Sequence, residues 1–167
     1  ILDAFEENPS LEGMRKFIET AQKALLIKKS EAAEFGEMGT TVAVLMTDGK
    51  KAVWATVGDT RVYIYRRSRI VEVSEDHSIP FEKFSRGEIE FGEIRSDREA
   101  NKLRKALGDR LAWEPDISSV FSISGNHSFL LCTDGFWRNI IEEEMEIASR
   151  LSISLTSLPK YMWVRVG

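Results

Sequence analysis

The sequence predicts an α+β fold built mostly on antiparallel sheet. Several strand-like segments follow one another through turns too short for the crossover that parallel neighbours need. Helical patterns stand before this run of strands, after it and near the end of the chain, so helices and strands are segregated rather than alternating. No G-x-G-x-x-G and no G-x-x-x-x-G-K-[ST] motif occurs, which argues against a doubly wound nucleotide-binding fold.

The composition is that of one ordinary globular domain. The chain has 167 residues, 43% of them hydrophobic and 30% charged, with a net charge of −4. An acidic balance is unlike that of proteins that bind nucleic acid, and no apolar run reaches the ~18 residues that span a bilayer. We therefore expect no nucleic acid and no membrane as partner. The single cysteine, Cys132, and the absence of a recognisable secretory leader predict a cytoplasmic location.

The first third of the chain predicts one helix followed by strands. Residues 9–34 carry an apolar stripe at helical spacing, with Asn8 as the expected cap and Pro9 in the first turn. The β-branched and aromatic segments that come next are separated by short turns. We expect these segments to form one four-stranded antiparallel meander, with strands at residues 40–46, 52–57, 61–65 and 70–73.

The rest of the chain predicts a helical excursion and then two more strands. Residues 76–115 are sparse in large apolar side chains, and helices are expected at residues 81–86 and 97–107. Strands are expected at residues 117–123 and 128–132, followed by an acidic helix at residues 142–151. Residues 152–167 give no clear pattern.

Catalysis by histidine or cysteine is poorly supported by the sequence. The two histidines, His77 and His127, form no metalloprotease motif, and no G-x-S-x-G nucleophile motif occurs. Cys132 lies in an apolar run, which favours a buried, inert thiol over a nucleophile.

Aspartates at strand ends are the more informative candidates. Asp134 follows the apolar run before a glycine, so it is either a ligand for a hard cation or part of a simple turn. Asp59 either caps the turn between two strands or pairs with Arg61. Asp76 precedes the helical excursion and is a helix cap, a metal ligand or both. The basic residues 66–69, with Arg61, either form a solvated turn or attract acidic phosphopeptides.

Five segments of the chain stop looking generic when they are taken together. They are MGTT (38–41), VGDTRVYIYRRSRIVEVSEDHS (57–78), GEI (87–89), NKLRKALG (101–108) and SFLLCTDGFW (128–137). Each segment alone is a weak signal, but in this order and spacing the five resemble the metal-dependent protein serine/threonine phosphatases of the PP2C (PPM) family, in their bacterial form.

The resemblance implies a sandwich of two mostly antiparallel β-sheets flanked by α-helices. It implies a single, partial domain over residues 1–167, with a small helical flap at about 76–115. It also implies two Mn²⁺ or Mg²⁺ ions at one end of the sandwich, where a metal-activated water attacks phosphoserine or phosphothreonine in a phosphoprotein substrate. By position, Asp134 and Asp76 match metal ligands. The matching structural positions are Gly39, Thr40, Thr41, Gly58, Asp59 and Gly135.

Other family motifs have no counterpart in this sequence. Nothing before Met38 matches the early arginine, E-D and D-G-x-G-G motifs, and no Asp-Asn pair follows Trp137. We therefore identify no catalytic side chain and expect weak or no catalysis from the chain by itself. The chain is either part of an active phosphatase or a degenerate PP2C-like module that acts by binding a partner. An unrelated α+β domain is the remaining alternative.

Overall fold

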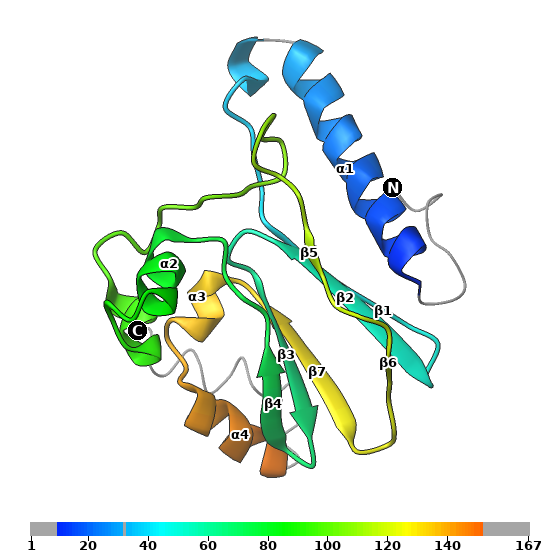
Figure 1. Cartoon of the computed structure of the whole chain (residues 1–167), viewed down its shortest axis with the longest axis vertical. Helices are drawn as coiled ribbons and strands as arrows, with labels where there is room; N and C mark the ends of the chain where they lie inside the picture. Colours follow the sequence, from blue (N-terminus) through cyan, green and yellow to red (C-terminus); the bar gives the residue numbers. More distant parts are fainter. Residues whose placement is uncertain (1–9, 32, 152–167) are drawn as a thin grey trace.

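The protein is a sandwich of two antiparallel β-sheets with helices on both outer faces (Figure 1). The computed structural model describes residues 10–31 and 33–151. One sheet contains β1 (Val42–Thr47), β2 (Lys51–Val57), β5 (Asp116–Ile117) and β6 (Phe121–Ser122). The other contains β3 (Arg61–Arg66), β4 (Arg69–Val73) and β7 (His127–Cys132). The α+β class and the sandwich that the sequence implied are confirmed.

The alternation of side chains along the strands builds three layers of core. On β3, Val62 and Ile64 point inward, where they pack with Trp54 of the opposite sheet. Tyr63 and Tyr65 point outward and are covered by helices. Because both faces of β2 and β3 are covered, nearly every residue of these strands is buried.

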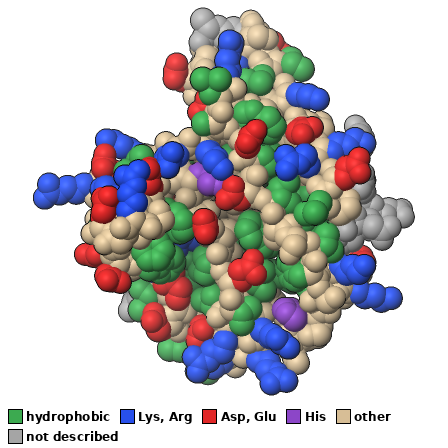
Figure 2. Space-filling model, viewed as in Figure 1, with side chains coloured by type: hydrophobic (Ala, Val, Ile, Leu, Met, Phe, Trp, Pro, Cys, Tyr) green, Lys and Arg blue, Asp and Glu red, His purple; other side chains and the backbone are tan. Residues whose placement is uncertain are grey.

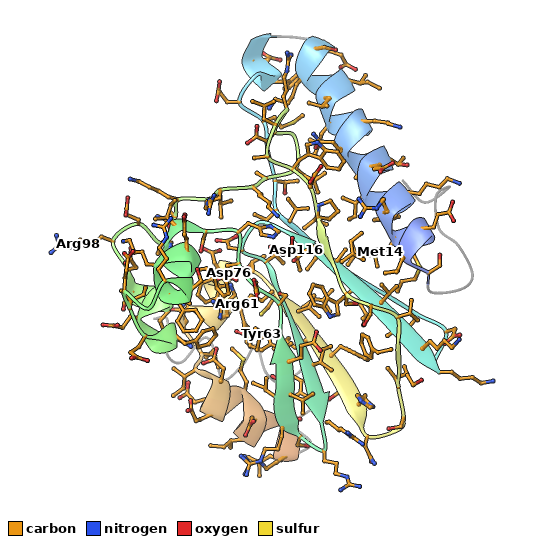
Figure 3. All side chains as sticks on the ribbon, in the orientation of Figure 1. Met14, Arg61, Tyr63, Asp76, Arg98 and Asp116 are labelled. Carbon is orange, nitrogen blue, oxygen red and sulfur yellow. The ribbon has the colours of Figure 1, made fainter. Side chains whose placement is uncertain are left out.

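The outer face of the first sheet is covered by α1 (Leu11–Glu31), which carries Met14 and Ile18 into the core (Figures 1 and 3). The expected helix is confirmed. The Ser10 hydroxyl accepts the Gly13 N–H at 2.9 Å, so a serine caps the helix. The expected cap Asn8 and the expected first-turn Pro9 lie outside the described residues.

In the described part of the chain, short helices cover the second sheet. They are α2 (Ile79–Ser85), η3 (Phe91–Ser96), α3 (Asp134–Trp137) and α4 (Glu142–Arg150). Ser78 caps α2, and its hydroxyl accepts the Phe81 N–H at 3.3 Å. None of the helices in the described ranges combines the length and apolarity needed to cross a membrane.

The expectation of one continuous meander is wrong. The four strands form two hairpins in different sheets, because residues 58–60 carry the chain from β2 across to β3. Gly58 makes this crossing possible. Its φ is +98°, and a Cβ atom there would lie 2.3 Å from Thr41 Cγ2. The second neighbour of β3 is therefore β7, a strand distant in sequence.

Two further local expectations need correction. Residues 97–107 form no helix, because isolated bridges draw them to distant backbone: Leu103 pairs with Ser78 and Leu107 with Thr40. The expected strand at residues 117–123 is split into β5 and β6, which pair with opposite ends of β2. The expected single domain of residues 1–167, with its flap at about 76–115, stays a prediction.

Candidate metal site at one end of the sandwich

The strand directions bring the motif segments to one end of the molecule. At this end β1 and β3 begin, while β2, β4 and β7 finish; Val42 pairs with Val57, and Arg61 with Cys132. The chain segments that flank these strand ends contain all three candidate aspartates. Segments far apart in sequence thus meet in space because antiparallel neighbours alternate in direction.

Asp134 has a partly exposed carboxylate. It is the first residue of α3, directly after β7, and 41% of its side chain is exposed. Its Oδ1 accepts the Gly135 N–H at 2.8 Å, and its Oδ2 lies 3.3 Å from Arg138 Nη1. The sequence left open whether Asp134 belongs to a simple turn or is a metal ligand; the structure places it as a half-exposed carboxylate at the start of α3.

Asp59 lies on the crossing between the sheets and interacts with both other aspartates. Burial, followed by the negative charges of Asp134 and Asp76, raises the pKa of Asp59 to about 6. Asp134 and Asp76 are therefore both near enough for their charges to act on the carboxylate of Asp59. The sequence suggested only a structural role for Asp59; its place opposite the end of β7 could not be read without the strand pairing.

Asp76 has a different environment from the other two. It is 4% exposed, and its two oxygens accept from Arg61 Nε at 2.8 Å and Arg61 Nη2 at 2.6 Å (Figure 3). Burial raises the pKa of Asp76, and Arg61 opposes that shift. Arg61 thus pairs with Asp76 rather than with Asp59, and it lies in the core rather than on the basic turn.

His77 is held in one tautomer. Its Nδ1 accepts the Gly58 N–H at 3.0 Å, so its Nε2 carries the proton that faces Asp116 Oδ2 at 3.1 Å. The histidine thereby fixes the crossing that carries Asp59. Burial raises the pKa of Cys132 to about 12, which keeps the thiol protonated and agrees with the expected inert cysteine.

The expected structural residues lie around the same crossing. Thr40 exchanges backbone hydrogen bonds with Leu107 at 3.0 and 2.8 Å. The Thr41 and Thr60 hydroxyls are 2.7 Å apart. A Cβ atom on Gly39 would lie 3.3 Å from the Leu107 oxygen, whereas Gly135 has more space. These contacts join the segment around Leu107 to the start of β1.

A cavity of about 440 Å³ opens beside this end, between α2 and the segment before β5. Asp76 and His77 form its inner wall, and Phe81 and Leu111 contribute apolar surface. Two basic residues at its rim are already paired, Arg104 with Glu82 and Lys105 with Asp116. Figure 2 shows acidic and basic side chains interspersed over the face of the molecule seen there, with no single dominant charge.

The donor set fits a divalent ion only in part. Hard oxygen ligands suit Mg²⁺ and Mn²⁺, and Asp59 and Asp134 supply them. The oxygens of Asp76 are both occupied by Arg61. Among the described residues, no group of three or more His, Cys, Asp and Glu side chains is arranged to hold a metal ion.

Comparison with known proteins identifies the family. The model of the family described as protein phosphatase 2C matches residues 2–83. A serine/threonine phosphatase of Listeria welshimeri, stp, is 30% identical over 143 residues, which are 84% of this chain and 56% of the relative. This chain belongs to the protein phosphatase 2C family. The family match includes α1, a region in which the sequence showed no family motif. The expected absence of the family's N-terminal and C-terminal metal motifs stays a prediction.

Solved structures agree with this assignment at the level of the fold. The phosphatase Stp1 of Staphylococcus aureus superposes with a TM-score of 0.79 at 23% identity, over 90% of this chain and 59% of that one. The catalytic domain of the phosphatase PstP, solved in complex with two manganese ions, gives 0.65 at 18% identity, over 89% and 67%. This protein phosphatase 2C chain spans little more than half the length of its Listeria relative.

Proposed function

We propose that the chain forms part of a metal-dependent protein serine/threonine phosphatase, in which a metal-activated water hydrolyses phosphoserine or phosphothreonine. The observation that carries the proposal is the convergence of Asp59 and Asp134 at one end of a protein phosphatase 2C sandwich. The chain covers 56% of its Listeria relative, and the activity is proposed for the whole protein.

In this function the two aspartates supply oxygen ligands for Mn²⁺ or Mg²⁺. Such an ion, when bound, neutralises phosphoryl charge and lowers the pKa of a bound water from 15.7 toward about 7. Asp59 lies on the crossing into β3, and Asp134 follows the end of β7. Both segments lie at the same end of the sandwich, so these two aspartates are the proposed ligands. Burial and, after it, the negative charge of Asp134 raise the pKa of Asp59; a bound cation would offset that negative charge.

Asp76 is proposed as a weaker or indirect contributor. To ligate a metal, it would have to give up one of its bonds to Arg61. The cavity next to Asp76 is the proposed place for residues that flank the phosphorylated side chain, with Phe81 and Leu111 as its apolar surface. A phosphoprotein in the cytoplasm is the proposed substrate.

The deciding experiment measures hydrolysis of a phosphothreonine peptide and of p-nitrophenyl phosphate, with Mn²⁺ and with EDTA. It uses both the complete gene product and the 167-residue chain. Manganese-dependent turnover that Asp134→Asn lowers by about 100-fold or more supports the proposal. Asp48→Asn is the matched control, because Asp48 also precedes a glycine at a strand end but lies in the hairpin between β1 and β2. Manganese-dependent turnover that survives Asp134→Asn refutes the assigned role.

A binding module without catalysis is the second candidate. It is favoured by the lack of a three-ligand group within the described part of the chain. In that case the complete gene product has no turnover at any Mn²⁺ concentration but still binds a phosphothreonine peptide more tightly than its unphosphorylated form. Turnover by the complete gene product refutes this candidate.

A further inference from the structure

Trp137 connects the two candidate ligand segments. It is the last residue of α3, three positions after Asp134, and it is 2% exposed. Its indole Nε1–H donates to the backbone oxygen of Asp59 at 2.9 Å. One side chain therefore joins the helix that begins with Asp134 to the crossing that carries Asp59.

The ring of Trp137 is itself held in place by the buried ion pair. The Arg61 guanidinium carbon lies 3.6 Å from the ring centroid, within cation–π distance. The same guanidinium is bound to both oxygens of Asp76. Arg61 is 2% exposed, so this stack is shielded from water and has little freedom to shift.

The backbone of Trp137 is fixed from the flap. Arg95, in η3, donates from Nη1 to the Trp137 oxygen at 2.9 Å and lies 3.3 Å from the Ile140 oxygen. Arg95 Nη2 also bonds Glu142 Oε2 at 2.6 Å. The short helix α3 is thus held at its end by the flap, and its indole N–H is aimed at the crossing.

We propose that Trp137 is a positioning residue, which sets the separation of Asp59 and Asp134 through its indole N–H and thereby the affinity for a divalent cation. The inference rests on the proposed function, because it takes these two aspartates as ligands. A tryptophan that only filled the core would act through its ring. The hydrogen bond from its indole N–H to the Asp59 backbone oxygen is a directional interaction that packing alone does not require.

The test separates the N–H from the ring. Trp137→Phe keeps an aromatic ring over Arg61 and removes the donor. Trp54→Phe is the matched control, because Trp54 is also buried and donates its indole N–H, here to Glu72 Oε1 at 3.1 Å. A second variant places 3-benzothienylalanine at position 137. This residue keeps the bicyclic shape with sulfur in place of N–H, so the test survives if phenylalanine disturbs folding.

Hydrogen–deuterium exchange and Mn²⁺ binding are measured on the complete protein. Both position-137 variants are expected to speed exchange of residues 58–61 and 133–137, and to weaken Mn²⁺ binding by electron paramagnetic resonance, by about three- to tenfold. Trp54→Phe should change neither quantity. Equal effects of the control, or unchanged exchange in the benzothienylalanine variant, overturn the inference. Failure of the wild-type protein to bind Mn²⁺ overturns the proposed function instead. The exchange comparison then still tests whether the Trp137 N–H holds the Asp59 segment in place.

Discussion

Replacing Asp76 with alanine leaves the Arg61 guanidinium buried without its main partner. The carboxylate makes two bonds to that group, and both side chains are almost fully inaccessible to water. Breaking a buried pair by removing one member typically costs about 3–5 kcal/mol, because the remaining charge stays desolvated. Glu142 Oε1 lies 3.8 Å from Arg61 Nη1 and offsets part of the loss. We therefore expect the free energy of unfolding to fall by about 3 kcal/mol.

The assay is thermal and urea unfolding at neutral pH in EDTA, followed by circular dichroism. For a protein of this size, 3 kcal/mol corresponds to a decrease in Tm of about 6–12 °C. Glu31→Ala is the control, because it removes an exposed pair with Lys28 and should cost less than about 0.5 kcal/mol. Replacing Arg61 and Asp76 together by methionine and leucine should recover much of the loss.

A decrease below about 1 kcal/mol in Asp76→Ala would refute the reasoning, because the pair would then not be holding the buried charge. If such a stable variant also bound Mn²⁺ more weakly, Asp76 would act chiefly as a metal ligand. A large loss of stability would instead identify Asp76 as part of the frame that holds Arg61 and Trp137 together.

Three further outcomes are expected. The raised pKa of Asp59 means that the folded protein binds this proton more tightly than the unfolded chain. In EDTA its stabilising contribution, present below about pH 4, is lost as pH rises through about 6. Because the carboxyl is partly exposed, we expect this pH-dependent change in unfolding free energy to be about 1 kcal/mol. Asp59→Asn should abolish it, and the same dependence of stability on pH in the wild-type protein and the variant would contradict this. In urea unfolding, Gly58→Ala should destabilise the protein by at least about 2 kcal/mol more than Gly49→Ala. Both glycines have positive φ, but only at Gly58 would an added Cβ atom clash with Thr41. Similar losses in the two variants would exclude this steric explanation. At pH 8 iodoacetamide should modify Cys132 at least about 100-fold more slowly in the folded protein than in urea, and rapid labelling would argue against a protonated thiol.

Local sequence pattern predicted most of the elements. Strand positions agree to within a residue or two for β1, β2, β3, β4 and β7, because β-branched and aromatic runs bounded by turn residues are local signals. The pattern failed at residues 97–107, where bonds to distant backbone replace a helix. It also placed β2 and β3 in one sheet, since a short turn looks the same whether the chain pairs back or crosses to another sheet.

The sequence by itself determined the class of fold and the family resemblance, because motif spacing and apolar patterning are properties of the chain; the metal-binding role of Asp134 stays a prediction. Only the tertiary structure decided that Arg61 pairs with Asp76, that Asp59 lies within the field of Asp134, and that Trp137 reaches the Asp59 backbone. These relations join residues up to 78 positions apart. They depend on strand pairing and on the exclusion of water, and neither can be read from the local order of residues.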